Sequence, residues 1–412
     1  MERRVVITGA GLVSSLGDSA PRLHRAMCEG KSGLHPLEGF DVERPRCSLG
    51  GNLVSFSAES YLKKKNLRPL DRTGQLVAVA TQLALEDSGW TTEELGKQDV
   101  GLVLGTFFGS VHTISEFDRH AVLAGPSYAS PMDFANTVIN AAAGQAAIWH
   151  GLRGVNSTIS AGSTSGLLAL GYAVDLIRNG RGTAILAGGA DEFCFESFLG
   201  FERAGFLCGS DGGTGEFPIP FDRRRNGFAL AEAGGLLMLE DADSAVARGA
   251  YVRGEIKGYG SAYDCARGRH SERAVEAIER AMRLALVNAE LTPGEIDCLS
   301  ASANGSVLGD RREALAIAHV FDAQSDCVPV TAIKSMIGEA LGASGALQAL
   351  DLLETMRDGV LPGIPLLEQM EDGLRPVVVG PKPRQVDVRT ALINSVGFDG
   401  NCCSLVLGRF LM

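Results

Sequence analysis

One serine in this sequence occupies a position that suits a nucleophile. Residues 156–173 read NSTISAGSTSGLLALGYA, a pattern that predicts a strand, a sharp turn at the glycine and then a helix. Ser163 falls on that turn, at the expected helix N-terminus, where the helix dipole and free backbone N–H groups stabilise an oxyanion. A serine hydroxyl is almost wholly protonated at neutral pH and needs a partner base. Acyl or ester transfer on Ser163, with Glu339 as the base, is therefore one hypothesis.

Strands and helices that would hold this turn alternate along the chain. Runs rich in Val, Ile and Leu predict buried strands at residues 4–8, 100–104, 184–187, 235–240, 251–258, 296–301, 391–396 and 404–408. Apolar residues at helical spacing predict helices at residues 75–88, 165–178, 274–289, 311–319 and 343–357. This alternation favours a largely parallel sheet that is covered by helices on both faces.

The chain shows no clear division into separate bodies. Residues 210–216 (SDGGTGE) predict a loop, but no linker rich in Pro, Ser and Gly interrupts the sequence. We place a soft boundary where a fresh strand begins, which gives one half at residues 1–250 and another at residues 251–412. The two halves are expected to form one body.

Composition excludes several classes of function. The formal charge of −11 argues against a nucleic-acid or anionic-membrane partner, because phosphate binding needs clustered Lys and Arg. The nine cysteines are single apart from Cys402 and Cys403, and none has metal-site spacing, so no metal is expected. Residues 5–11 (VVITGAG) lack the third glycine of a dinucleotide motif, so no nicotinamide cofactor is expected. No signal peptide or apolar run of ~20 residues is present, which favours the cytoplasm.

Several blocks, taken in order, carry a resemblance to a known family. They are the serine turn above, residues 186–191 (LAGGAD), 220–235 (PFDRRRNGFALAEAGG), Gly309-Asp310 with Glu313-Ala314, Lys334-Ser335-Met336 with Gly338, and residues 394–401 (NSVGFDGN). Together they resemble the β-ketoacyl synthases, or ketosynthases, of the thiolase superfamily. The resemblance implies an α/β thiolase fold, with two similar βαβ-rich halves that form a five-layered α-β-α-β-α body.

The same resemblance implies that the condensing chemistry has been lost. A ketosynthase uses a cysteine thiolate as nucleophile, two histidines that donate hydrogen bonds to the malonyl thioester carbonyl, and a supporting lysine. By the matched blocks these positions are Ser163, Ser302, Glu339 and the retained Lys334. An ionised carboxylate accepts hydrogen bonds and cannot donate them, so Glu339 would repel an enolate. We also expect that Glu339 forms an ion pair with Lys334.

Such a pattern is similar to that of a chain length factor, the non-catalytic subunit of a type II polyketide ketosynthase heterodimer. This implies a partner ketosynthase and acyl chains delivered on the phosphopantetheine of an acyl carrier protein, with no bound cofactor. The strand at residues 156–160 would lie at the two-fold interface. The candidates for a tunnel or gate that sets chain length are Phe107, Phe108, Val111, Ile114, Phe117 and Phe398. Product class, aromatic or polyene, stays open.

Alternatives remain at this stage. Ser163 could serve an acyltransferase or esterase, although a triad wants a histidine between nucleophile and carboxylate. Val111, Ile114 and Phe117 share a helical face and could equally be plain core. A homodimeric ketosynthase with a relocated mechanism is a third reading. None of the histidines falls in the matched catalytic blocks, and surface or capping roles are expected for all of them: His24, His35, His112, His120, His150, His270 and His319.

Overall fold

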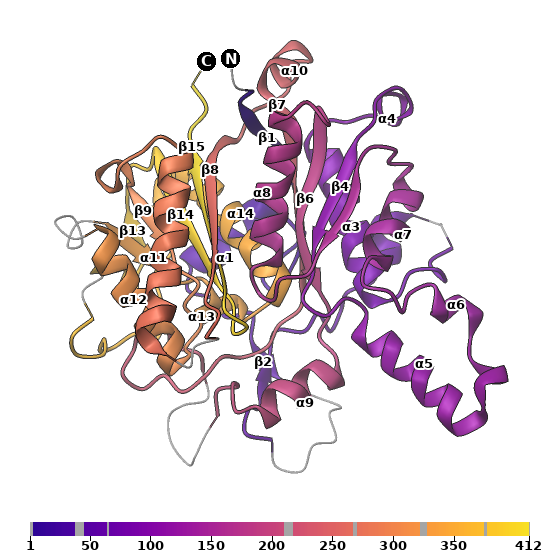
Figure 1. The fold of residues 1–412 in the computed structure, drawn as a ribbon, viewed down its shortest axis with the longest axis horizontal. Coiled ribbons are helices and arrows are strands. Elements are labelled where there is room, and N and C mark those ends of the chain that lie inside the picture. Colours follow the sequence, from indigo (N-terminus) through magenta and orange to yellow (C-terminus); the bar gives the residue numbers. More distant parts are fainter. Residues whose placement is uncertain are drawn as a thin grey trace.

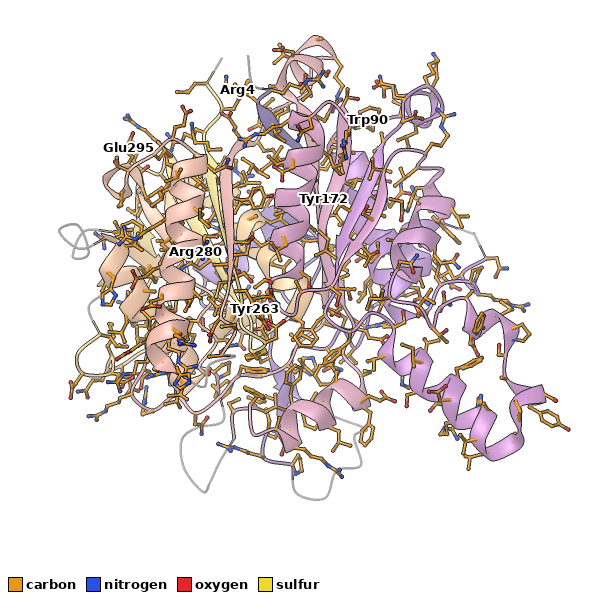
Figure 2. The ribbon with its side chains drawn as sticks, in the orientation of Figure 1. Arg4, Trp90, Tyr172, Tyr263, Arg280 and Glu295 are labelled. Carbon is orange, nitrogen blue, oxygen red and sulfur yellow. The ribbon has the colours of Figure 1, made fainter. Side chains whose placement is uncertain are left out.

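The structure is a computed structural model, and it describes residues 3–37, 45–63, 66–209, 217–266, 270–321, 328–374 and 377–411. The loop expected at residues 210–216 lies outside the described residues. The two chain termini lie close together at one end of the molecule (Figure 1). Arg4 links them there, because its guanidinium donates to the Leu411 carbonyl at 3.0 Å and pairs with Glu255 at 2.7 Å (Figure 2).

One eleven-stranded sheet runs through both halves of the described chain in the order β12-β10-β9-β14-β15-β8-β1-β7-β6-β4-β5. The first half supplies β1 (Val5–Val13), β4 (Gly101–Gly105), β5 (Asn156–Ile159), β6 (Ala184–Asp191) and β7 (Ala233–Asp241). The second half supplies β8 (Gly254–Tyr263), β9 (Cys298–Ser300), β10 (Pro329–Thr331), β12 (Val377–Val378), β14 (Thr390–Val396) and β15 (Asn401–Gly408). Two small ribbons pair β2 (His35–Pro36) with β3 (Leu49–Gly50), and β11 (Val360–Leu361) with β13 (Arg384–Gln385).

The expectation of a largely parallel sheet is wrong. The outer parts of the sheet are parallel, through β4 with β5 and β6 on one side and β9 with β10 and β14 on the other. The centre is antiparallel, because β1 pairs with both β7 and β8, and β15 pairs with β8 and β14. Strands β14 and β15 are joined by a tight turn with no helix, and a tight turn permits only antiparallel pairing.

Helices divide the molecule into layers, as the resemblance implied. On the outer face of the first half lie α3 (Arg72–Asp87) and α7 (Ala141–His150), and on that of the second half lie α11 (Ser271–Asn288) and α12 (Val307–Phe321). Between the halves lie α8 (Ser165–Arg178) and α14 (Ser344–Asp358), which contact strands of both (Figure 1). These two central helices are buried on almost every side, and α14 buries polar side chains as well as apolar ones, whereas α11 buries one stripe and exposes a charged face. The five-layered α/β thiolase fold is confirmed.

The remaining helices are shorter or lie at the margin. They are α1 (Ala20–Cys28), α2 (Ala58–Leu62), α4 (Thr92–Lys97), α5 (Val111–Ala124), α6 (Pro131–Phe134), α9 (Phe195–Arg203), α10 (Ala242–Ala247) and α13 (Lys334–Ile337), with single 3-10 turns at Pro126–Tyr128, Pro293–Glu295 and Leu341–Ala343. Helices α5 and α6 form an arm that projects from the body, and α5 has no buried residue (Figure 1). None of the described helices combines the length and the apolar character that a membrane crossing requires.

Candidate functional site

Ser163 lies on the tight turn between β5 and α8, as the sequence predicts. Gly162 precedes it with a φ of +61°, and a Cβ at Gly162 would come within 2.8 Å of the Asp399 carboxylate, so only glycine fits there. The Ala161 N–H donates to Ser165 Oγ at 2.8 Å and steadies the turn. Ser163 is fully buried, and its Oγ has no hydrogen-bond partner among the described residues. The described residues therefore place no base within hydrogen-bond distance of this hydroxyl.

Ser302 lies just beyond the end of β9 and is part of a hydrogen-bond network. Its Oγ accepts from the Val396 N–H at 2.9 Å and from Lys334 Nζ at 3.4 Å, and its backbone N–H donates to Glu313 at 2.8 Å. The short side chain thus connects the end of β14 with the buried lysine. It offers neither the reach nor the ring nitrogen of an imidazole.

Lys334 and Glu339 form the ion pair that the sequence predicts. Lys334 Nζ lies 2.8 Å from Glu339 Oε2, with the side chains 0% and 1% exposed. Glu339 also accepts from Asn304 Nδ2 at 2.8 Å, Ser344 Oγ at 2.9 Å and the Leu341 N–H at 3.2 Å. Four donors hold the carboxylate, which satisfies a buried charge that would otherwise be costly. Glu339 is therefore an acceptor of hydrogen bonds at the centre of this polar cluster.

Two further buried carboxyl groups support the pocket from α12. Burial raises the pKa of Glu313 to about 7, against the opposing effect of hydrogen bonds from the Ser302 N–H and the Asn394 amide. Burial likewise raises the pKa of Asp310 to about 6, although the Phe221 N–H and Arg225 favour its charged form. Sequence reasoning found both residues as parts of a block and assigned them no role, because their burial depends on the packing of α12.

An open pocket of about 360 Å³ leads to Ser302 and stops short of Ser163. Its lining includes Ser302, Asn304, Phe398 and Asp264, with Phe206 at one side, and Ser163 is not part of it. The pocket is lined mostly by apolar surface with several polar groups, which is typical of ligand sites. Access from this pocket therefore reaches the Lys334 and Glu339 network rather than the buried serine.

The six tunnel or gate candidates fall into two separate groups. Phe107 and Phe108 contact Phe201, which also packs 5.8 Å from Phe398, ring centre to ring centre. Phe398 lies within 5.0 Å of Phe206 and 5.2 Å of Phe228 in the same aromatic cluster. Sequence reasoning missed Phe201, Phe206 and Phe228, and the run of phenylalanines in residues 193–206 was the signal.

The second group lies on the projecting arm. Val111, Ile114 and Phe117 all lie on α5, as their spacing predicts, and all three are half-buried rather than core. The ring of Phe117 is 5.9 Å from that of Phe134 on α6, so the two helices of the arm pack through aromatic side chains. The plain-core reading of this stripe is wrong.

Comparison with known proteins decides the family. The N-terminal domain model of β-ketoacyl synthases matches residues 2–245, and the C-terminal domain model matches residues 253–367. The 3-oxoacyl-[acyl-carrier-protein] synthase 2 of Vibrio harveyi is 31% identical over 410 residues, which is 99% of each chain. This chain belongs to the β-ketoacyl synthase family.

Solved structures of β-ketoacyl synthases agree with this assignment. A structure described as the ishigamide ketosynthase/chain length factor matches with a TM-score of 0.91 and 30% identity over all of both chains. A β-ketoacyl synthase from Burkholderia phymatum matches with a TM-score of 0.92 and 28% identity, over 99% of this chain and 100% of that one. A type II polyketide acyl carrier protein in complex with its ketosynthase matches with a TM-score of 0.89 and 25% identity over all of both chains.

The expectation that every histidine has a surface or capping role is wrong for His24. His24 is only 2% exposed and lies 2.7 Å from the buried Asp351 on α14. The sequence around His24 could not predict this pairing, because the partner carboxylate is 327 residues away in the sequence. By contrast, Cys402 and Cys403 are buried on β15, as expected.

Proposed function

We propose that this chain is a non-catalytic β-ketoacyl synthase subunit of the chain length factor type. It pairs with an active ketosynthase and shapes the tunnel that sets the length of the growing acyl chain. The observation that carries the proposal is the state of Glu339, a buried carboxylate that accepts from four donors and pairs with Lys334. A condensing site needs hydrogen-bond donors where this chain has an acceptor.

The chemistry of condensation explains why the replacements matter together. Decarboxylation of a malonyl thioester leaves an enolate, whose negative oxygen must receive hydrogen bonds, and loss of one such donor costs about 10²- to 10³-fold in rate. Ser302 already accepts from Val396 and Lys334, and Glu339 adds a negative charge. Ser163 brings a hydroxyl without a base in place of a thiolate. No useful condensation is expected from such a site.

The exposed edge of the sheet supports a protein partner. Strand β5 pairs only with β4 among the described residues, so one row of its backbone groups is left open. Large apolar side chains are exposed on the neighbouring arm and on α7: Val122, Leu123, Tyr128, Met132, Phe134, Val138, Ile139 and Ile148. An open edge beside exposed apolar surface suits a stable interface. The occupant that we propose is the active ketosynthase, which shares this fold.

The arm supports the tunnel role. Val111, Ile114 and Phe117 are half-buried in the single chain, so a partner seated on the arm would cover them and leave them as the wall of a shared channel. The acyl chain would arrive on the phosphopantetheine of an acyl carrier protein bound to the complex, with no further cofactor, in the cytoplasm. Phe107, Phe108 and Phe398 would then fill the vestigial entrance with their aromatic cluster.

Co-expression with a ketosynthase that retains Cys, His and His tests the pairing. The two chains are expected to co-purify in equal amounts and to elongate acyl groups only as a pair. A stable homodimer of this chain that becomes acylated on Ser163 by an acyl carrier protein substrate would contradict the proposal. Mass spectrometry of the peptide that contains Ser163 distinguishes the two outcomes.

A variant of the arm tests the tunnel in the reconstituted pair. Phe117→Ala removes a ring at the proposed wall and is expected to lengthen the products by one or more extension units, as read by mass spectrometry. The matched control is Asp118→Ala, the exposed neighbour on the same helix, which should leave product length unchanged. Unchanged length with Phe117→Ala removes this residue from the gate and leaves the pairing itself untouched.

A further inference from the structure

A nucleophile, an imidazole and a carboxylate come together where α1 packs on α14. His24 and Cys28 lie one turn apart on α1, which packs on α14. His24 Nδ1 is 2.7 Å from Asp351 Oδ1, and His24 Nε2 is 3.5 Å from Cys28 Sγ. The order thiol, imidazole, carboxylate is that of an activated cysteine whose base is oriented by an acid.

The carboxylate makes the histidine a cation. Burial alone would lower the pKa of His24, but hydrogen bonds with Asp351 and Cys28 raise it to about 10. An imidazolium donates from both ring nitrogens, so Nδ1 donates to Asp351 and Nε2 is directed at the sulfur. Asp351 is 0% exposed, and its Oδ2 has no hydrogen-bond partner among the described residues, so its charge is balanced mainly by His24.

The other charged groups around Cys28, His24 and Asp351 largely pair with one another. Those that act on His24 or share its surroundings are Arg25 on α1, Glu354, Arg357 and Asp358 on α14, and Arg253, which pairs with Glu354. Arg357 pairs with both Glu354 and Asp358, so these charges largely cancel. The imidazolium of His24 is thus the cation in hydrogen-bond contact with the Cys28 sulfur.

We propose that Cys28 is a covalent modification site that forms mixed disulfides with small disulfides, activated by His24 and positioned through Asp351. Cys28 is the last residue of α1 and is partly exposed, in contrast to the buried His24 beside it. An imidazolium beside a cysteine favours the thiolate, which is the attacking species in thiol–disulfide exchange. Cys28 does not line the pocket of the ketosynthase site, so this role is independent of the proposed function.

The exchange step balances without any further reagent. The Cys28 thiolate attacks one sulfur of a disulfide RS–SR, the S–S bond of that molecule breaks, and a Cys28–S–SR bond forms. The leaving thiolate RS⁻ departs into solvent, where it takes a proton from water to form RSH, and His24 remains an imidazolium. A small disulfide needs only access to the sulfur, whereas catalytic turnover of a larger substrate would need a binding cavity beside it.

The pH dependence of labelling in the unaltered full chain is the primary test. Each cysteine is labelled with limiting iodoacetamide at pH values from about 5.5 to about 9, a range that spans the titration of an ordinary thiol. The labelled peptides are quantified by mass spectrometry. Cys265 is more exposed and serves as the internal reference. An unassisted thiol loses about tenfold in rate per pH unit below its pKa of about 8.5, and the rate at Cys28 should fall less steeply than that at Cys265. A Cys28 profile that runs parallel to that of Cys265 overturns the proposal.

Variants and a disulfide probe complete the test. His24→Gln should slow Cys28 labelling at about pH 6 by tenfold or more and leave Cys265 unchanged, and Asp351→Asn should act in the same direction. The matched control is Arg25→Gln, which removes a positive charge from an exposed position on α1 and should change the rate less than about twofold. Oxidised glutathione should modify Cys28 before Cys265. Preferential modification of Cys265 would contradict the proposal even if a variant failed to fold.

Discussion

At the scale of single residues, the Lys334 and Glu339 pair lies in a buried, hydrogen-bonded polar cluster. Lys334 and Glu339 are buried together, and Asn304, Ser344 and the Leu341 N–H supply the remaining hydrogen bonds. A buried pair with satisfied hydrogen bonds is tolerated, while either ion alone is not. The pocket therefore depends on both charges being present.

Removal of one charge should expose this dependence. Glu339→Gln leaves Lys334 buried without a counter-ion, and the free energy of unfolding should fall by about 3–5 kcal/mol. Urea titration followed by circular dichroism measures the change. The matched control is Glu93→Gln, which breaks the exposed pair with Lys97 and should cost less than about 1 kcal/mol. A loss below about 1 kcal/mol for Glu339→Gln would mean that the pocket does not rely on the pair.

At the scale of elements, strand β5 has two chemically different edges. The Val155 carbonyl accepts from Leu102 and the Ile159 carbonyl accepts from Thr106, so alternate residues of the strand face β4. By this two-residue period, Ser157 also faces β4, whereas the backbone groups of Thr158 face away from it. The N–H of Thr158 is thus free to pair with a strand of a partner.

Proline substitution distinguishes these two edges. Thr158→Pro removes an outward N–H and should weaken the proposed heterodimer by about tenfold or more, because one hydrogen bond contributes about 1 kcal/mol and the ring obstructs the facing strand. Sedimentation equilibrium with the partner measures the affinity. Ser157→Pro is the comparison, since it breaks the ladder with β4 and should lower the stability of the single chain instead. Unchanged affinity with Thr158→Pro would remove β5 from the interface.

At the scale of the whole molecule, buried acids in both halves make stability depend on pH. Burial raises the pKa of Glu192 to about 8 and that of Glu313 to about 7, and it raises those of Asp191 and Asp310 to about 6. The folded state therefore holds protons that the unfolded chain releases near pH 4 to 5. Each group favours the fold at low pH, and that contribution is lost as the pH rises through the folded pKa.

Stability should accordingly decline between about pH 5 and about pH 8, with a slope of at most about 1.4 kcal/mol per pH unit for each group. Urea midpoints measured across this range give the slope. Glu192→Gln keeps the size of the side chain and removes the titration, so it should flatten the decline above about pH 6 and stabilise the protein most at pH 8. A midpoint that rises with pH, or a variant with the same slope as the parent chain, would contradict this account.

Local pattern was sufficient for much of the molecule. Helix α8 begins and ends where its apolar spacing predicts, at Ser165 and Arg178, and the turn at Ser163 precedes it. The pairing of Lys334 with Glu339 was also predictable, because the two residues are only five positions apart in the sequence. Such features depend on neighbours within a few residues, which a sequence displays directly.

Only the tertiary structure decided the rest. The mixed direction of the sheet follows from which strands become neighbours, and the union of the two halves follows from the pairing of β1 with β8. The His24 and Asp351 pair joins positions 327 residues apart, and Asn304, which donates to Glu339, lies 35 residues away from it in the sequence. The periodicity of apolar residues indicates which side of a helix or strand is buried, but not which other element covers that side. The contacts above depend on which element covers it. The sequence by itself therefore determined the family and the residue types at positions 163, 302 and 339, and packing determined which partners Glu339 and His24 acquire.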